Sequence, residues 1–192
     1  MPTDESESTL VARAIGGDAD AFGILYALYF DRVYLYARLK MGNPTDAEDL
    51  TATVFLKAWK SIDRFSPKAG SSFAGWLFRL AHNTLIDGFR RAKEVISLDS
   101  DGAAHVRNRA SASPEDQLVW RLTLDELHQA LGELTQEQRD VVLLRFVEGL
   151  SAREVGIIMG KQEGAVRGMQ FRAIEALRRA LSALREEPLH ND

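Results

Sequence analysis

Residues 150–173 constrain the fold more than any other part of the chain, because their pattern predicts two short helices joined by a tight turn. Ser151 and Glu154 have the Ser-x-x-Glu spacing of a capping box, which starts a helix. Gly160 can adopt the left-handed conformation that ends a helix, and a second helix is expected to begin near Glu163. This layout is typical of a helix-turn-helix, whose second helix can lie in the major groove of DNA. Alone, the pattern also fits helical proteins that never bind DNA.

The second predicted helix has a basic side and an apolar side. Arg167 and Arg172 are expected on the exposed side, with Lys161 just before the helix. Spacings of three and four predict the residues that face the first helix, namely Val166, Met169 or Gln170, Ala173, Ile174 and Leu177. The same spacing predicts a set of core residues that do not read DNA, namely Phe171, Ile174, Leu177, Leu181 and Leu184.

Composition excludes several classes of protein. The chain has 192 residues with 45% apolar content, which predicts a folded core. No apolar run reaches the roughly 18 residues of a membrane-spanning helix, and the acidic N-terminus is unlike a signal peptide, so we expect a cytoplasmic protein without membrane insertion. Cysteine is absent and the four histidines are scattered, so no metal site and no cofactor is expected. No catalytic motif is evident, which predicts a protein that is not an enzyme.

Charge is distributed unevenly along the chain, whose net charge is −4. Residues 1–50 hold nine acidic and four basic side chains, whereas residues 161–185 hold six basic and two acidic ones. A second basic cluster lies in residues 79–93, where four basic side chains accompany Asp87 alone. Two basic patches on an acidic chain indicate two local contacts with nucleic acid and a different partner for the acidic surface.

Nearly every segment has helical periodicity, so the predicted fold class is all-α. Helices are predicted at about 19–40, from Asn43 or Thr45 to 62, from Ser71 or Ser72 to 91, and at 114–132, 136–148, 152–159 and 163–184. Thr135 and Gln138 form a capping box that is expected to open the helix at 136–148. Residues 94–112 are polar and aperiodic, which indicates a flexible linker that only a partner would order. The prediction is therefore two small helical domains, 1–93 and 113–192, joined by this linker.

The order of three segments resembles the bacterial sigma-70 family, and within it the two-domain extracytoplasmic-function class. Residues 46–59, Asp-Ala-Glu-Asp-Leu through Phe-Leu-Lys-Ala-Trp, look like region 2.2 of that family. Residues 73–91, with Trp-Leu-Phe-Arg-Leu-Ala-His-Asn, look like regions 2.3 and 2.4. Residues 134–145 with the helix-turn-helix after them look like region 4. The resemblance thus covers most of the chain.

The resemblance implies an RNA polymerase sigma factor that directs promoter-specific initiation without covalent chemistry. The implied partners are core RNA polymerase, through its β′ clamp and β flap, promoter DNA and an anti-sigma factor. Implied core-binding residues are Asp46, Glu48, Asp49, Leu50, Phe55 and Trp59. Implied −10 residues are Ser66, Lys68, Ser71, Trp76, Arg79, Asn83, Asp87, Arg90 and Arg91. Implied −35 residues are Lys161, Gln162, Glu163, Gly164, Ala165, Arg167, Arg172 and Arg178.

The chain departs from the usual region 4 pattern at four positions. Gly156 stands where alanine is usual, Gly168 and Met169 where a Ser-Arg pair is common, and Gln170 where leucine is common. A glycine inside the second helix costs about 1 kcal/mol relative to alanine. These departures bear on the preferred −35 sequence and not on the fold.

Two other classes of function make different predictions. A LuxR-type regulator shares the helix-turn-helix but predicts a β/α domain upstream, and residues 1–92 show no such alternation. A sigma mimic that acts only through protein contacts would not need the basic second helix.

Overall fold

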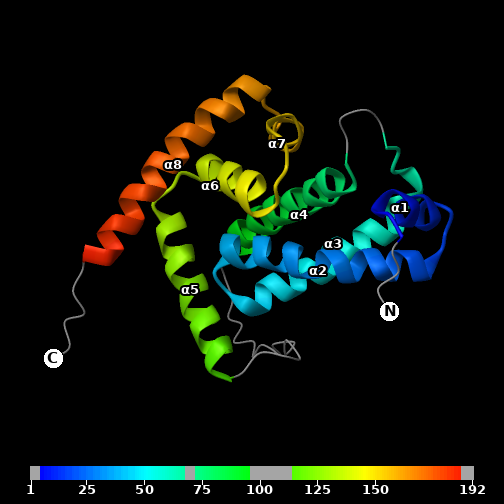
Figure 1. Ribbon diagram of the computed structural model, residues 1–192, viewed down its shortest axis with the longest axis horizontal. Coiled ribbons are helices and arrows are strands. Elements are labelled where there is room, and N and C mark those ends of the chain that lie inside the picture. The colour runs from blue at the N-terminus through cyan, green and yellow to red at the C-terminus, as the bar shows by residue number, and fades with distance from the viewer. Residues whose placement is uncertain (1–4, 68–71, 96–113, 187–192) are drawn as a thin grey trace. The chain divides into compact units, whose positions relative to one another are not determined.

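The computed structural model describes residues 5–67, 72–95 and 114–186, and every regular element in these ranges is a helix (Figure 1). For residues 91–95, 114–122 and 183–186 only the backbone is described. The predicted all-α class is confirmed, and the part of the chain before residue 96 contains no strand in the described ranges. None of the described helices combines the length and apolar character needed to span a bilayer.

The chain divides into two compact units. The first unit comprises Met1–Ala37 and Thr45–Ala103, and the second comprises Arg38–Pro44 and Ala104–Asp192. Residues 96–112 of the predicted linker lie outside the described residues, so its flexibility and the domain boundaries at 93 and 113 remain predictions. Residues 94 and 95 continue a helix, which ends at Val95 and not near Arg91.

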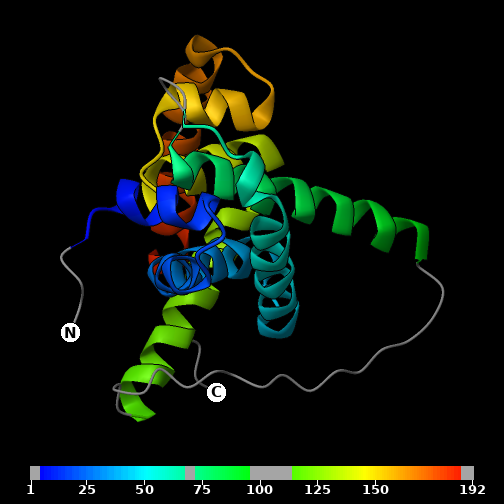
Figure 2. The ribbon, with the colours of Figure 1, turned by 90° about the vertical axis from the view of Figure 1, so that its right-hand side faces the viewer.

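The first unit is built mainly from three long helices, α2 (Ala19–Met41, whose last turn belongs to the second unit), α3 (Pro44–Ser61) and α4 (Phe73–Val95). A short 3-10 turn, η1 (Ile62–Arg64), follows α3. In Figure 2 the last turns of α4, drawn in green, extend beyond the other helices of this unit. This projection leaves Ile86, Phe89 and Arg90 exposed on α4.

A further helix, α1 (Glu7–Ile15), was not expected from the sequence. It is only nine residues long and buries Leu10, Val11 and Ala14, which is too short a pattern to separate from a polar N-terminal segment. It packs against η1, and Glu7 Oε2 accepts a hydrogen bond of 2.6 Å from the Tyr29 hydroxyl on α2. Burial, together with this carboxylate, raises the pKa of Tyr29.

Aromatic side chains fill much of the first unit. Tyr29 and Phe73 meet edge to face at 5.3 Å between ring centroids, and Tyr26 meets Phe55 in the same way at 4.7 Å. Their positions on α2, α3 and α4 show that these helices pack through their aromatic stripes. Edge-to-face ring pairs are favourable beyond the area that they bury. The largest fully buried side chains of this unit include Leu25, Val33, Tyr36, Val54, Leu77 and Phe78.

The second unit contains α5 (Pro114–Gly132), α6 (Gln136–Val142), η2 (Leu143–Val147), α7 (Ala152–Met159) and α8 (Glu163–Glu186). The capping box predicted at Thr135 and Gln138 is present. The helix predicted as one piece over 136–148 ends in a π-helical turn, η2, which widens its last residues. Helix α8 packs against α5, α6 and α7, and the buried side chains there are mainly aliphatic.

Candidate nucleic-acid interface

Helices α7 and α8 form the predicted helix-turn-helix. Ser151 caps α7: its hydroxyl accepts from the Glu154 amide, and the Glu154 carboxylate accepts from the Ser151 amide at 2.8 Å. Gly160 ends α7 with φ of 65°, in the left-handed region that favours glycine. The amide of Lys161 donates to the carbonyl of Gly156 at 2.8 Å. The turn is therefore closed by backbone hydrogen bonds, and α8 begins directly after it.

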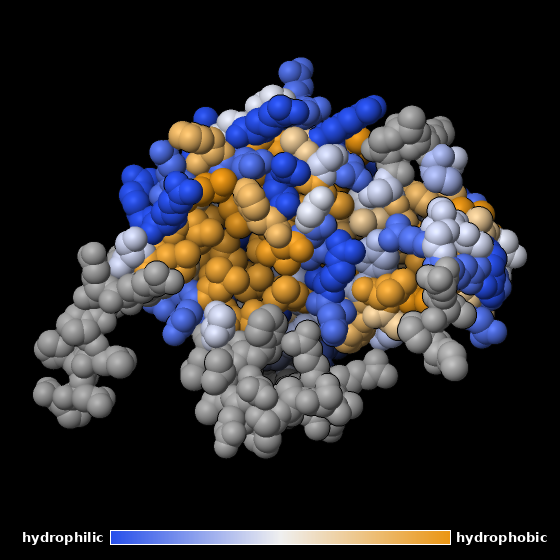
Figure 3. Space-filling model, in the orientation of Figure 1, coloured by the Kyte–Doolittle hydropathy of each residue, from blue (hydrophilic) through white to orange (hydrophobic). Residues whose placement is uncertain are grey.

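The inner side of α8 is formed by small and medium apolar residues. Val166, Met169 and Ala173 are buried, and Gln170 is half-buried. The sequence left Met169 and Gln170 open as alternatives for this face, and the structure assigns it chiefly to Met169. Apolar residues gather on the inner side of α8, and hydrophilic residues line its outer edge (Figure 3).

Phe171 is a correction to the sequence-based prediction. It was assigned to the core, but its side chain is 65% exposed. The reason is geometric: successive helical residues differ by about 100°, so Phe171 lies far from Met169 and Ala173 on the helix circumference. It lies four residues after Arg167, on the same outer face. That spacing is the signal that would have identified Phe171 as a surface residue.

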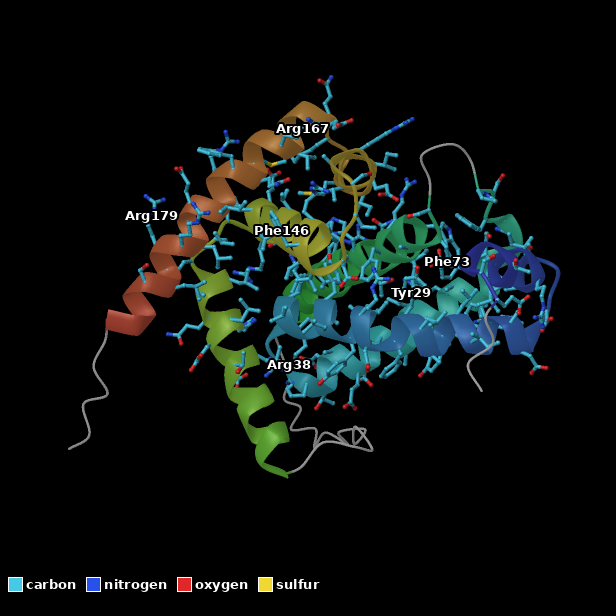
Figure 4. All side chains as sticks on the ribbon, viewed as in Figure 1. Tyr29, Arg38, Phe73, Phe146, Arg167 and Arg179 are labelled. Carbon is cyan, nitrogen blue, oxygen red and sulfur yellow. The ribbon has the colours of Figure 1, made fainter. Side chains whose placement is uncertain are left out.

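The outer face of α8 presents the predicted DNA-contacting residues. Arg167 and Arg172 are exposed, and in Figure 4 Arg167 and Arg179 extend away from the helix. Gln162, Gly164, Ala165 and Arg178 are also exposed. The first helical hydrogen bond of α8 runs from the Val166 amide to Gln162. The amides just before Val166 therefore have no acceptor within the helix and can bind a phosphate oxygen.

Two of the predicted −35 cations form ion pairs with carboxylates. Arg167 Nη2 lies 2.5 Å from Glu163 Oε1, one helical turn away. Lys161 Nζ lies 2.7 Å from Glu137 Oε1, at the start of α6. Glu163, which the resemblance implied as a −35 residue, here pairs with Arg167. All four side chains remain at least 30% exposed, so a phosphate can displace the carboxylates.

Helix α4 presents a second face, formed by residues at spacings of three and four. Arg79, Asn83 and Arg90 are exposed, whereas Trp76 and Asp87 are half-buried. Asp87 lies 3.5 Å from Arg90. The predicted α4 residues therefore lie along one side of the helix. Ile86 and Phe89, which are 40% and 42% exposed, were not predicted to belong to this surface.

At the start of α4 an aromatic cluster supports Trp76. The Trp76 ring lies 5.1 Å from Phe65 and 5.5 Å from Phe73, which are both buried. Its remaining exposed surface offers a stacking platform for a base. Ser72 caps the helix by accepting from the Gly75 amide at 2.9 Å. Ser66 is exposed, whereas Lys68, Ser71 and the side chain of Arg91 lie outside the described residues.

The predicted core-binding residues on α3 divide into exposed and buried groups. Asp46 and Asp49 are exposed and Glu48 is half-buried. Leu50 and Phe55 are buried within the first unit, so they shape the helix and do not form its surface. Trp59 is 40% exposed and packs against Phe22. Leu56, 55% exposed and seven residues after Asp49, shares this surface, and the heptad spacing would have identified it.

Comparisons with known proteins agree with this arrangement. The family model "Sigma-70 region 2" matches residues 25–95, and "Sigma-70, region 4" matches residues 124–177. The chain is 38% identical over 184 residues to the ECF RNA polymerase sigma factor BldN of Streptomyces coelicolor, covering 94% of this chain and 69% of BldN. It is 31% identical to the ECF RNA polymerase sigma factor SigW of Bacillus subtilis, covering 88% and 92%.

A solved structure supports the fold over nearly the whole length. The structure of CnrH in complex with the cytosolic domain of CnrY matches with a TM-score of 0.71 at 28% sequence identity, and the match covers 93% of this chain and 99% of CnrH. Within the described residues, no group of three or more acidic, histidine or cysteine side chains is arranged to hold a metal ion.

Proposed function

The chain belongs to the sigma-70 family, in its extracytoplasmic-function class, and on this premise we propose which of its surfaces direct RNA polymerase to a promoter. The outer face of α8 reads the −35 element, the exposed side of α4 engages the −10 element, and the exposed side of α3 binds core polymerase. The protein acts by binding alone, in the cytoplasm, without catalysing a reaction.

The observation that carries this assignment is the outer face of α8. Arg167 offers two parallel donors that match the acceptors of guanine, and Phe171 offers an apolar contact to the thymine methyl group. Arg172 and Arg178, with the free amides at the start of the helix, suit phosphate oxygens. Base-reading and backbone-binding groups therefore share one side of a single helix.

The α4 surface suits a melted strand and not a duplex. An extruded base needs a stacking surface beside positive charge. Trp76 supplies the surface, and Arg79 and Arg90 supply charge farther along the same side. Asn83 can donate to and accept from a base edge. We assign the −10 contact to this side, extending from Ser66 to Arg90.

For core polymerase we propose the side of α3 that carries Asp49, Leu56 and Trp59. Its carboxylates complement a basic partner, and its exposed apolar groups provide the area that a stable interface buries. The β′ clamp is the partner proposed for this side, and the β flap for the second unit. CnrH, matched above, was solved with a partner protein, and we propose an anti-sigma factor for this chain as well.

The −35 assignment is tested by replacing Arg167 with alanine. Holoenzyme would first select a preferred −35 duplex from a random library, and binding to that duplex would then be measured. Loss of a bidentate contact is expected to cost about 1–3 kcal/mol. Arg179→Ala, on the same helix but farther from its start, is the control and should change binding little. Equal losses in the two variants would contradict the assignment.

The core-binding assignment is tested by the double variant Glu48→Lys, Asp49→Lys. Neither side chain is buried, so the variant should fold, and its polymerase affinity should fall because two negative charges become positive. Glu133→Lys, an exposed site in the second unit, is the control. Wild-type affinity for core polymerase in the double variant would refute the assignment.

A further inference from the structure

We propose that Gly156 and the Arg145–Gln170 hydrogen bond are positioning elements that set where α8 sits, and so determine which −35 sequence the protein prefers. This inference rests on the proposed role of α8. None of these three residues is proposed to touch DNA. Gly156 acts through a backbone contact that holds α8 in place, and the Arg145–Gln170 pair acts through a side-chain hydrogen bond.

Gly156 allows the turn to lie directly on α7. It is buried inside the helix, and a Cβ built on it would lie 2.6 Å from the carbonyl oxygen of Lys161. Real Cβ atoms are not found that close to another heavy atom, and the atom that would have to move is backbone. The same turn residue donates its amide to the Gly156 carbonyl at 2.8 Å. An alanine at this position must therefore displace the turn.

That displacement reaches α8 because no flexible segment intervenes. Lys161 and Gln162 are the only residues between Gly160 and the first residue of α8, Glu163. A bidentate contact to a base tolerates displacements of about 0.5 Å or less. A shift of the turn by a few tenths of an ångström moves the start of α8 toward that limit, and Arg167 moves with it.

Arg145 holds α8 from a second side. Its Nε donates to Gln170 Oε1 at 3.0 Å, and its Nη1 donates to the carbonyl of Leu150. Arg145 lies in η2 and Leu150 lies just before Ser151, the N-cap of α7, so one guanidinium ties α8 to the segment that enters the helix-turn-helix. The π-helical turn of η2 is the local geometry from which Arg145 makes both bonds. A leucine side chain at position 170 has no hydrogen-bond acceptor, so Arg145 would lose its hydrogen bond to α8.

The decisive measurement is specificity at constant stability. Full-length variants assembled with core polymerase would be bound to the −35 duplex selected by the wild type and to a scrambled duplex. Gly156→Ala should lower the ratio of the two affinities about ten-fold, the equivalent of one base contact. Gly132→Ala adds the same methyl group in the second unit at an exposed site with open space, and should leave the ratio within about two-fold.

Position 170 provides a second test, which remains valid if the Gly156→Ala variant does not fold. Gln170→Leu should lower the ratio of the two affinities. Gln170→Glu, whose carboxylate still accepts a hydrogen bond from Arg145, should keep the ratio near its wild-type value. Urea unfolding of each variant separates an altered position from lost structure. An unchanged ratio in folded Gly156→Ala, or in Gln170→Leu, would overturn the inference and leave the proposed function intact. A wild type that prefers no −35 sequence would overturn the proposed function itself.

Discussion

Helices α4 and α8 are nearly equal in length, 23 and 24 residues, yet their functional faces are fixed by different means. On α4, Leu77, Phe78 and Ala81 are completely buried, and the exposed side follows from helical periodicity alone. The position of α8 depends on the turn before it, where the Lys161 carbonyl oxygen lies too close to Gly156 for a Cβ atom to fit. One face is specified by side chains and the other largely by the path of the main chain.

The surroundings of the two helices differ in the same sense. The start of α4 is supported by rings, because Phe73 contacts both Tyr29 and Phe65. Among the described residues, all ring pairs lie in the first unit, and the side chains buried against α8 are aliphatic. Rings near a surface suit the capture of an unstacked base, whereas a duplex needs only a helix held at the right depth.

The largest effect should follow from removing a side chain that fixes the α4 face. Leu77 is fully buried, so Leu77→Ala should lower the free energy of unfolding by about 2–5 kcal/mol through lost burial and the cavity left behind. Urea unfolding followed by far-UV circular dichroism and tryptophan fluorescence would measure it. Leu56→Ala, where the side chain is 55% exposed, is the matched control and should cost much less. Similar costs would show that the side-chain account of α4 is wrong.

Replacing Gly88 in α4 and Gly156 in α7 should have different effects, because only Gly88 has open space around it. Gly88 is exposed, and a Cβ there would meet no atom within 4 Å. Gly88→Ala should therefore stabilise the protein by about 0.5–1 kcal/mol, since alanine favours the helix and restricts the unfolded chain. Thermal unfolding midpoints would measure this. Gly156→Ala, the same change in α7, should not stabilise, and an equal gain at both positions would remove the contrast.

A smaller effect is expected from the ion pair beside the start of α8. Glu137→Gln releases Lys161, so affinity for any duplex should rise about two-fold, because an exposed pair is worth up to about 1 kcal/mol. Titration at several salt concentrations should also show a steeper salt dependence. Glu133→Gln removes an equal charge from a neighbouring exposed site and serves as the control. Identical gains in both variants would assign the effect to net charge and not to the pair.

The sequence predicted the helix ends better than it predicted which side chains are exposed. Capping residues predicted the starts of α6 and α7, and Gly160 predicted the end of α7, because these signals act over a few residues. The −10 residues on α4 were implied by the family resemblance, and the structure places Arg79, Asn83 and Arg90 among its exposed residues. By contrast, Phe171 was misplaced because an apolar residue was assumed to face inward, which many surface residues do not.

Contacts between distant residues could not be predicted. Lys161 pairs with Glu137 and Arg145 with Gln170, and each pairing depends on how α6, η2 and α8 pack. The close approach at Gly156 likewise depends on the path of the turn. Its sequence signal was the departure from alanine, which gave a position but no distance.

The smallest effect concerns the caps, where the two units again differ. Helix α2 is capped by a carboxylate: Asp18 Oδ1 accepts from the Asp20 and Ala21 amides at 3.0 Å, and Asp18 Oδ2 pairs with Arg13. The bond from the Ala21 amide, with Arg13 beside it, lowers the pKa of Asp18 below its ordinary value of 3.8. Helix α6 is capped by Thr135 and Gln138, which are both uncharged.

Lowering the pH should therefore weaken the cap of α2 and leave the cap of α6 unchanged. A depressed carboxyl pKa stabilises the folded state fully above the ordinary value of 3.8, and this contribution is lost as pH falls through the lowered pKa. The difference in unfolding midpoint between wild type and Asp18→Asn should be present at neutral pH and vanish in acid, because asparagine caps without charge. For Thr135→Ala the difference should stay constant across the same range. Thermal unfolding at a series of pH values would measure both, and parallel curves would show that the negative charge of Asp18 contributes nothing to the α2 cap.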